Sequence, residues 1–265
     1  MAAMIALDVS ILQKTFPAGG GQAAYIALRD LRFLVNKGQF VCVVGPSGTG
    51  KTTMLNIIAG LDTDFDGVIR TNLGEDGRRL VYMFQSPRLL PWRTVLENVE
   101  LVLDGEKGAR DVALGLIDEV GLADFAHAYP GQISLGMQRR AALARAFALN
   151  PGILLMDEPF VSLDENAADG LRALLMKLWR SRPTTVLFVT HDTREAVKLA
   201  TRILVFTPAP AKLAHDIPVT LSPLDRADPQ SVEAFRRSHP AFCGAFSVVS
   251  DMPSLNGRGA KSAAP

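Results

Sequence analysis

The stretch that most constrains this chain is GPSGTGKTT, residues 45–53, which directly follows the apolar run FVCVV at residues 40–44. An uninterrupted apolar run of this length is typical of a strand buried on both faces of a parallel sheet. Apolar residues then recur at helical spacing over residues 51–60. Three glycines stand between strand and helix and permit a tight turn: Gly45, Gly48 and Gly50. A strand, a glycine-rich turn and a helix in this order predict an α/β fold with an anion site at the turn.

The residues of this turn predict binding of a nucleoside triphosphate. Unpaired backbone N–H groups and the positive end of the helix dipole attract the negative charge of its phosphates. In the pattern G-x-x-x-x-G-K-T, which the chain meets in full, Lys51 reaches the β and γ phosphates, Thr52 ligates Mg²⁺ and Thr53 bonds the α phosphate. The predicted binding residues are Gly45, Pro46, Ser47, Gly48, Thr49, Gly50, Lys51, Thr52 and Thr53. The alternative is a glycine-rich turn with a solvated lysine.

A second apolar strand, residues 153–156, ends in two consecutive acids. Because the carboxyl ends of parallel strands lie at the same edge of a sheet, we expect Asp157 and Glu158 beside the glycine-rich turn. Asp157 would hold Mg²⁺ through water, and Glu158 would act as general base on the attacking water. The alternative is a strand that runs into a loop whose acids are merely solvated.

Composition limits the class of protein. Lys and Arg total 28 against 27 acidic residues, so the net charge of +1 provides no overall attraction to nucleic acid or anionic lipid. Cys42 lies inside an apolar strand, far from Cys243, which indicates a reducing compartment and hence the cytoplasm. Alternating apolar residues over residues 4–12 predict a strand rather than a signal peptide. No apolar run approaches the roughly 20 residues that span a bilayer, so at a membrane the chain would dock onto another protein.

The remaining strands and helices can be predicted from periodicity. Residues 4–12 and 31–36, with the pair at 68–69, alternate as half-buried antiparallel strands do. Residues 186–189 form another continuous apolar run, typical of a buried parallel strand. Residues 166–180 carry leucines at helical spacing.

Between about residues 86 and 150 the strand signals vanish and helical signals dominate. Thr94 and Glu97 predict a capping box at the start of one of these helices. We therefore predict one α/β domain over residues 4–240, with a mixed and parallel β-sheet core, an antiparallel β subdomain and a helical subdomain at about 86–150. Residues 241–265 are small, polar and rich in Gly and Pro, which predicts a poorly ordered tail.

These motifs, in this order, resemble the ATP-binding subunits of ABC transporters over residues 4 to about 215. The resemblance implies a P-loop NTPase fold of the ABC type, binding of ATP with Mg²⁺, and ATP hydrolysis coupled to transmembrane transport. Gln85, after the apolar residues 80–84, corresponds to the family's glutamine loop, which contacts Mg²⁺ and the attacking water. Residues 162–164 match the D-loop, which crosses the dimer interface, and His191 matches the switch histidine that contacts the γ phosphate.

Several of these matches leave a choice between residues or roles. Phe16 occupies the place of the family's adenine-stacking aromatic residue, and Tyr25 is a rival for that role. Gln85 alone would more often be a solvated loop residue. A lone histidine at a strand end is usually a capping residue, and Asp192 and Glu195 could cap the following helix in either case.

The family signature, LSGGQ or LSGGM, reads ISLGM at residues 133–137, so Leu135 replaces the first glycine. Ser134 remains a good N-cap for the following helix. Its hydroxyl, the Gly136 N–H and the helix dipole can still face a γ phosphate, because a side chain at position 135 leaves the backbone donors in place. We expect an altered but competent site. The alternatives are a Ser134 that only caps the helix and a catalytically silent cassette that binds ATP to hold a complex together.

The resemblance also implies partners. Two copies of the chain would sandwich two ATP molecules head to tail, with Ser134 of one copy completing the site of the other. Transmembrane permease subunits, and indirectly a periplasmic or extracellular solute-binding protein, would complete the assembly at the cytoplasmic face of the cell inner membrane. Nucleic acid is not an expected partner. Residues 86–98 offer apolar anchors for a permease helix, unless Leu89, Leu90 and Trp92 pack inside the helical subdomain.

Details of the motifs narrow the branch of the family. The text LLPWRTV at residues 89–95, Met137 in the signature and DEPF at residues 157–160 resemble the nitrate, sulfonate and taurine importer group. The implied solute is a small anion or a sulfonate. An ATPase subunit of another ABC system is the alternative. Two other classes fit the sequence less well. A soluble ABC-type ATPase would usually carry a coiled-coil insertion, two fused cassettes or a basic stripe, and none of these is visible in the sequence. A P-loop kinase or GTPase would lack the ordered glutamine, signature and histidine motifs.

Overall fold

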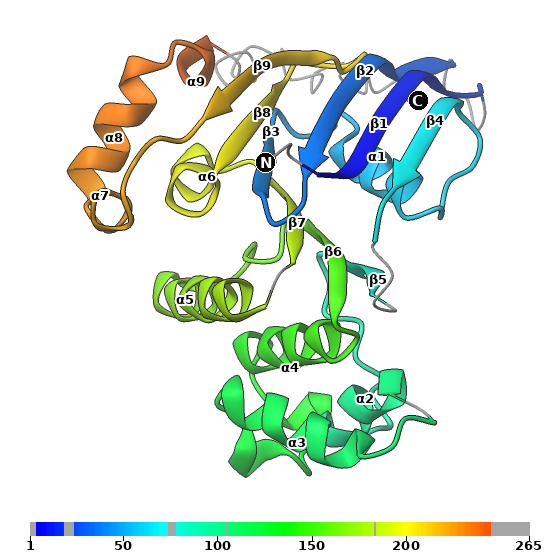
Figure 1. Ribbon diagram of the computed structural model, residues 1–265, viewed down its shortest axis with the longest axis vertical. Helices are drawn as coiled ribbons and strands as arrows, with labels where there is room; N and C mark the ends of the chain where they lie inside the picture. Colours follow the sequence, from blue (N-terminus) through cyan, green and yellow to red (C-terminus); the bar gives the residue numbers. More distant parts are fainter. Residues whose placement is uncertain (1–3, 19–23, 74–77, 104, 183, 245–265) are drawn as a thin grey trace, which may run out of the picture.

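The computed structural model describes residues 4–18, 24–73, 78–103, 105–182 and 184–244. These residues form a three-stranded and a six-stranded sheet with helices packed around them, and a helical part lies at one end of the long axis (Figure 1). The arrangement follows the predicted division into an α/β core, an antiparallel β part and a helical insert between β5 and β6.

The three-stranded sheet is antiparallel, with strand order β2-β1-β4. Its strands are β1 (Ile5–Phe16), β2 (Tyr25–Asn36) and β4 (Asp66–Thr71). They confirm the strands predicted from alternation. One detail differs from strict alternation, because the pairing of β1 with β2 shifts between Ile5 and Leu7. A register shift of this kind moves the side chains before it to the opposite face of the sheet. Ile5 is therefore 41% exposed, whereas Leu7 is fully buried.

The six-stranded sheet has the order β5-β6-β7-β3-β8-β9, and β9 is antiparallel to its neighbour while the other pairs are parallel. Its strands are β3 (Phe40–Val44), β5 (Arg79–Met83), β6 (Pro151–Asp157), β7 (Thr185–Thr190), β8 (Arg202–Phe206) and β9 (Leu213–Pro218). The three continuous apolar runs are confirmed as buried parallel strands. In β3, Phe40, Cys42 and Val44 pack on one face of the sheet and Val41 and Val43 on the other.

Each face of this sheet has its own apolar core. The three-stranded sheet and α1 (Lys51–Ile58) cover one face, and α5 (Glu165–Ser181), α6 (Thr193–Leu199) and the helical insert cover the other. The leucines predicted on one side of α5 are buried or half-buried in this second core: Leu171, Leu174, Leu175 and Leu178. Parallel strands covered on both faces explain why their sequences do not alternate.

The helical insert contains α2 (Val95–Glu100), α3 (Ala109–Glu119) and α4 (Leu135–Ala148), with short 3-10 turns at Leu101–Leu103, Ala123–Phe125 and Pro130–Gln132. The predicted capping box at α2 is confirmed. The Thr94 N–H donates to Glu97 Oε2 at 2.7 Å, and the Glu97 N–H donates to Thr94 Oγ1 at 3.2 Å. Two backbone donors at the start of α2 are thereby satisfied.

The C-terminal part contains α7 (Pro223–Ala227), α8 (Pro229–Ser238) and α9 (Ala241–Gly244). Arg236 of α8 donates to the Thr193 hydroxyl at 2.7 Å and so ties α8 to α6. Phe242 is 4% exposed, so the packed chain reaches α9. The rest of the predicted tail, residues 245–265, lies outside the described residues. Among the helices that the structure describes, none has the length and apolar character required to cross a bilayer.

Candidate nucleotide-binding and catalytic site

The glycine-rich turn joins the end of β3 to the start of α1, as the sequence predicts. Gly48 and Gly50 have φ angles of 76° and 88°, a left-handed conformation that residues with a side chain rarely adopt. A Cβ atom on Gly50 would also lie 2.9 Å from Cδ2 of Leu28 in β2. The Thr49 hydroxyl donates to the Pro46 carbonyl at 3.0 Å. The turn therefore presents the N-terminus of α1, with its free N–H groups, at the carboxyl edge of the sheet.

Lys51 begins α1, and its side chain folds back over the turn. The ammonium Nζ donates to the carbonyl of Gly45 at 2.8 Å and to that of Pro46 at 2.7 Å. Lys51 is only 5% exposed, and this burial lowers the pKa of its ammonium, while the charges of Glu158 and Asp157 act in the opposite direction. A positive charge is thus held within the turn and beside both predicted acids.

Asp157 is the last residue of β6, and the fold brings it to α1. The Thr52 hydroxyl donates to Asp157 Oδ2 at 2.8 Å, and the Tyr82 hydroxyl of β5 donates to the same oxygen at 3.4 Å. Asp157 is 5% exposed, and burial raises the pKa of its carboxyl group despite these hydrogen bonds. Burial also raises the pKa of the Tyr82 hydroxyl.

The oxygen atoms of Thr52 and Asp157 fit a magnesium ion. Mg²⁺ prefers hard oxygen ligands and is usually held by one or two protein groups together with phosphate oxygens and water. In the part of the chain that the structure describes, no group of three or more His, Cys, Asp or Glu residues could hold a metal ion. A hydroxyl and one carboxylate beside the glycine-rich turn therefore suit a nucleotide-bound Mg²⁺ better than a metal bound by protein alone.

Glu158 and His191 lie next to each other because β6 and β7 are neighbours in the sheet. His191 Nδ1 lies 3.2 Å from Glu158 Oε2. The Glu158 side chain is 20% exposed and that of His191 is 52% exposed, so water can reach the pair. The Glu158 N–H donates to the Val189 carbonyl at 3.0 Å, and the residue has a φ of 42°. A partly exposed carboxylate beside an imidazole can accept a proton from a water molecule.

The remaining predicted residues lie around this centre or apart from it. Gln85 is exposed and follows the end of β5, the strand next to β6. The rings of Phe16 and Tyr25 stack on each other, with centroids 5.4 Å apart and an interplanar angle of 17°. Phe16 ends β1 and pairs with Tyr25, which begins β2. Leu28 of β2 lies beside Gly50 of the glycine-rich turn. Because the two rings form one stack, the choice between them as the adenine platform stays open.

The signature residues belong to the helical insert and not to the glycine-rich turn. The Ser134 hydroxyl accepts from the Met137 N–H at 3.3 Å, which confirms Ser134 as the N-cap of α4. Leu135 is 38% exposed at the first position of the helix. A Cβ atom on Gly136 would meet Ala167 Cβ at 3.5 Å and Ser134 Oγ at 3.9 Å, both ordinary contact distances. In Figure 1, α4 lies in the helical insert, whereas α1 lies beside the three-stranded sheet. The signature and the glycine-rich turn are therefore far apart within one chain.

Comparison with known proteins identifies the family. Residues 28–161 match the family described as ABC transporter. The chain is 36% identical over 263 residues to the nitrate import ATP-binding protein of Synechocystis sp., covering 95% of this chain and 96% of that protein. It is 40% identical over 229 residues to an aliphatic sulfonates import ATP-binding protein of Burkholderia cenocepacia, covering 82% and 84%. The chain belongs to the ABC transporter family.

This ABC transporter chain is an ATP-binding subunit and an ABC ATPase. Its fold matches that of the ATP-binding cassette MJ0796, with a TM-score of 0.70 and 32% sequence identity, over 82% of this chain and 100% of that cassette. MJ0796 is dimeric in a post-hydrolysis state bound to ADP and Pi. The predicted family and the predicted fold class are confirmed.

Two charged residues near Glu158 and His191 could not be recognised from the sequence as neighbours of this site. Arg172 of α5 donates from Nε to Glu195 Oε1 of α6 at 3.1 Å, and its Nη1 lies 2.6 Å from Asp169. Both residues line a cavity with Glu158 and His191. Glu195 therefore does not serve as the helix cap that its position suggests, while Asp192 does cap α6. No short motif pairs Arg172 with Glu195, because they lie 23 positions apart.

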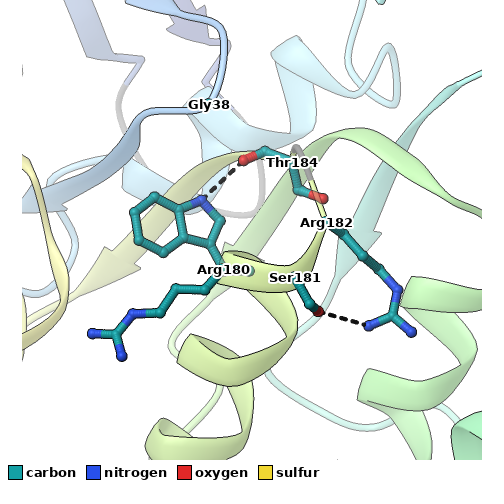
Figure 2. A pocket seen from close by; sticks show the side chains of 6 residues that line it. Gly38, Arg180, Ser181, Arg182 and Thr184 are labelled. Atoms are coloured by element: carbon teal, nitrogen blue, oxygen red, sulfur yellow. Dashed lines mark hydrogen bonds between the residues drawn. The ribbon is translucent and has the colours of Figure 1, made fainter.

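A depression elsewhere on the subunit is unrelated to this site. Figure 2 shows it between Gly38, at the turn before β3, and Thr184, just before β7. The Trp179 indole donates to the Thr184 carbonyl at 2.9 Å, and Arg182 Nη1 donates to Ser181 Oγ at 3.3 Å. The depression lies at the amino ends of the strands, whereas ligands of parallel sheets bind at the carboxyl ends. It contains none of the predicted site residues.

Proposed function

We propose that this ABC subunit binds ATP with Mg²⁺ at the carboxyl edge of its six-stranded sheet and hydrolyses it to drive a solute importer. The observation that supports this most directly is the convergence of two side-chain pairs there. Thr52 lies 2.8 Å from Asp157, and Glu158 lies 3.2 Å from His191. The first pair suits a magnesium ion and the second suits the activation of water.

The binding residues act through position and charge. Residues 45–53 hold the triphosphate with backbone N–H groups and with the Lys51 ammonium, which exchanges its loop carbonyls for phosphate oxygens. Thr52 would hold Mg²⁺ directly and Asp157 through water, with Gln85 as a further ligand. When bound, the ion neutralises charge on the phosphates. The stack of Phe16 and Tyr25 supports the adenine ring.

The catalytic residues act on the attacking water. Glu158 accepts a proton from the water as its oxygen bonds to the γ phosphorus, and the bond from that phosphorus to ADP breaks. His191 holds the Glu158 carboxylate through Nδ1 and contacts the γ phosphate through its other nitrogen. The products are ADP and inorganic phosphate.

Each active site is completed by a second copy of the chain. Ser134 and Gly136 face the γ phosphate bound to the partner copy, with the N-terminus of α4 directed at its charge. Leu135, at the first position of α4, is 38% exposed, so this end of the helix lies at the surface where a partner copy can reach it. The dimeric MJ0796 cassette supports the same arrangement. ATP binding closes the dimer and hydrolysis lets it open.

The loop before α2 is the permease contact. Trp92 is 70% exposed, whereas Leu89 is half-buried against the core. The neighbouring backbone is held by the Asn98 side chain, which is fully buried and bonds to Leu90, Arg93 and Thr94. A rigid loop that exposes an indole ring suits a cytoplasmic helix of a permease subunit better than a loop packed inward.

The names of the relatives support the class of solute. Two relatives, 36% and 40% identical to this chain, are a nitrate import ATP-binding protein and an aliphatic sulfonates import ATP-binding protein. We therefore assign a small oxyanion or sulfonate as the solute, delivered by a solute-binding protein to the permease. The subunit would lie peripherally on the cytoplasmic face of the inner membrane. Residues 4–240 form its ATP-binding domain, with the helical subdomain at about 86–150.

Phosphate release tests this proposal. The purified subunit with Mg²⁺ should release phosphate from ATP. The rate should rise when the subunit is reconstituted in vesicles with the permease that co-purifies with it, the solute-binding protein, and nitrate or an aliphatic sulfonate. A rate that responds equally to an unrelated neutral solute would contradict the proposed class of solute. A purified subunit that releases no phosphate from ATP would contradict the proposed hydrolysis.

A cassette that holds ATP without efficient turnover is the second candidate, and Leu135 in the signature is the observation that favours it. Leu135→Gly separates the two. If the altered signature is competent, the variant should hydrolyse ATP at a rate equal to or somewhat above that of the wild type, because the backbone donors are unchanged. An increase of about 100-fold, the size of a lost electrostatic contact in a transition state, would identify the wild type as the weakly hydrolysing cassette.

A further inference from the structure

The segment that follows the proposed general base has an unusual backbone. Glu158 has a φ of 42° and Ser162 a φ of 66°. Neither is a glycine, and residues with a side chain rarely adopt this left-handed conformation unless their surroundings enforce it. The hydrogen bonds within the segment are long, at 3.3 Å from the Val161 N–H to the Glu158 carbonyl and 3.4 Å from the Leu163 N–H to the Phe160 carbonyl. Something outside the segment must hold it.

Arg139 of α4 supplies that support. Its Nη1 donates to the Pro159 carbonyl and its Nη2 donates to the Val161 carbonyl at 2.6 Å. The two carbonyls stand between the two left-handed residues. On the other side, the Glu158 N–H donates to the Val189 carbonyl of β7 at 3.0 Å. The backbone of Glu158 is therefore fixed from β7 on one side and from α4 on the other.

The burial of Arg139 shows that this contact is more than packing. The residue is 4% exposed, and its Nε has no hydrogen-bond partner in the structure. Within the described residues it forms no ion pair with a carboxylate. Burying an uncompensated guanidinium is unfavourable, and an apolar side chain of similar length would fill the space without that penalty. The two carbonyl contacts are what an apolar residue could not provide.

We propose that Arg139 is a positioning residue that holds Glu158 in its catalytic orientation. The proposal rests on the proposed function of Glu158 as general base. Arg139 lies five residues after Ser134 on the same helix, so it also joins the signature rigidly to the general base of its own chain. A positioning role predicts that loss of Arg139 slows hydrolysis and leaves ATP binding intact, since its contacts lie on the segment after Glu158 and not on the phosphate-binding turn.

The experiment compares Arg139→Met and Arg139→Lys with the matched control Arg140→Met. Arg140 is the next residue of α4, and its guanidinium contacts only the Val120 carbonyl, at 3.5 Å, among the hydrogen bonds of the described residues. We expect kcat for Mg²⁺-dependent ATP hydrolysis to fall about 10- to 100-fold in Arg139→Met, the size of effect that small misplacements of a catalytic group cause. The fall in Arg139→Lys should be smaller, because an ammonium can still reach one carbonyl. ATP affinity should stay within about twofold in both.

A double variant shows whether the effect passes through Glu158. In a Glu158→Gln background, single-turnover hydrolysis should change by less than about threefold on adding Arg139→Met, because residues that act as one unit are not additive. A full 10- to 100-fold effect in that background would overturn the proposal, as would an Arg139→Met rate within twofold of the Arg140→Met rate. If Arg139→Met does not fold, Arg139→Lys decides: reduced kcat with intact ATP affinity supports the proposal, and unchanged kcat overturns it. Absence of hydrolysis in the wild type would instead contradict the proposed function.

Discussion

Asn98 offers the sharpest test of the rigid loop that we assign to the permease contact. Its side chain is fully buried, and Oδ1 accepts from the Leu90 N–H at 2.7 Å. Its Nδ2 lies 3.1 Å from the Leu90 carbonyl, 3.0 Å from the Arg93 carbonyl and 2.9 Å from the Thr94 carbonyl. Because the NH₂ group has only two hydrogens, its three contacts count as two hydrogen bonds. With the bond that Oδ1 accepts, Asn98 therefore makes three. At about 1 kcal/mol each, Asn98→Ala should lower the free energy of unfolding by about 3 kcal/mol.

Urea unfolding of the subunit measures this loss directly, and the melting temperature should fall by roughly 6 to 12 °C. ATP affinity and the basal hydrolysis rate should stay within about twofold, because the hydrogen bonds of Asn98 go to Leu90, Arg93 and Thr94 and not to residues of the phosphate-binding turn. Stimulation by the permease should be lost, because Trp92 is no longer held in place. Glu97→Ala, at the exposed capping position beside it, is the matched control and should cause a smaller loss of stability. Equal losses in the two variants, or permease stimulation that survives Asn98→Ala, would refute the reasoning.

Two further variants address the acids at the end of β6. Glu158→Gln should slow ATP hydrolysis by about 10² to 10⁴, the usual contribution of a general base, while nucleotide titration shows retained ATP binding and light scattering shows an ATP-dependent dimer. Equal turnover in variant and wild type would remove Glu158 from the mechanism. Asp157→Asn should stabilise the nucleotide-free protein, because burial raises the pKa of the Asp157 carboxyl group. The stability of the wild type then falls as pH rises from the ordinary carboxyl pKa of about 3.9 through the raised value, a loss that Asn avoids. Urea unfolding from pH 3.5 to 7 measures it, and a stability difference that shrinks with pH would contradict the sign.

The parts of the site that are predictable from sequence are those whose chemistry is local. The turn at residues 45–53 needs its glycines, lysine and threonines side by side, so the motif is visible in one short stretch. The acids at Asp157 and Glu158 follow an apolar strand, and parallel strands deliver their carboxyl ends to one edge. The family resemblance was predictable as well, because it depends on short motifs and on their order along the chain.

The parts that sequence could not predict depend on contacts between distant residues. Arg139 meets carbonyl groups about 20 positions away, and backbone carbonyls carry no sequence signal. Glu195 stands where a capping residue is expected, yet its side chain pairs with Arg172 across two helices. The exposure of Ile5 depends on a register shift in β1, which apolar alternation alone does not reveal.

Comparison of Lys51→Ala with the wild type, by calorimetric titration with ATP and Mg²⁺, tests the central claim most directly. Lys51 is the buried cation of the turn, with its ammonium 2.8 and 2.7 Å from two loop carbonyls. A hydrogen bond to a charged group contributes about 1.5 to 3 kcal/mol, so the variant should bind ATP roughly 10- to 100-fold more weakly. Unchanged affinity in the variant, or no saturable binding of ATP by the wild type, would contradict the account.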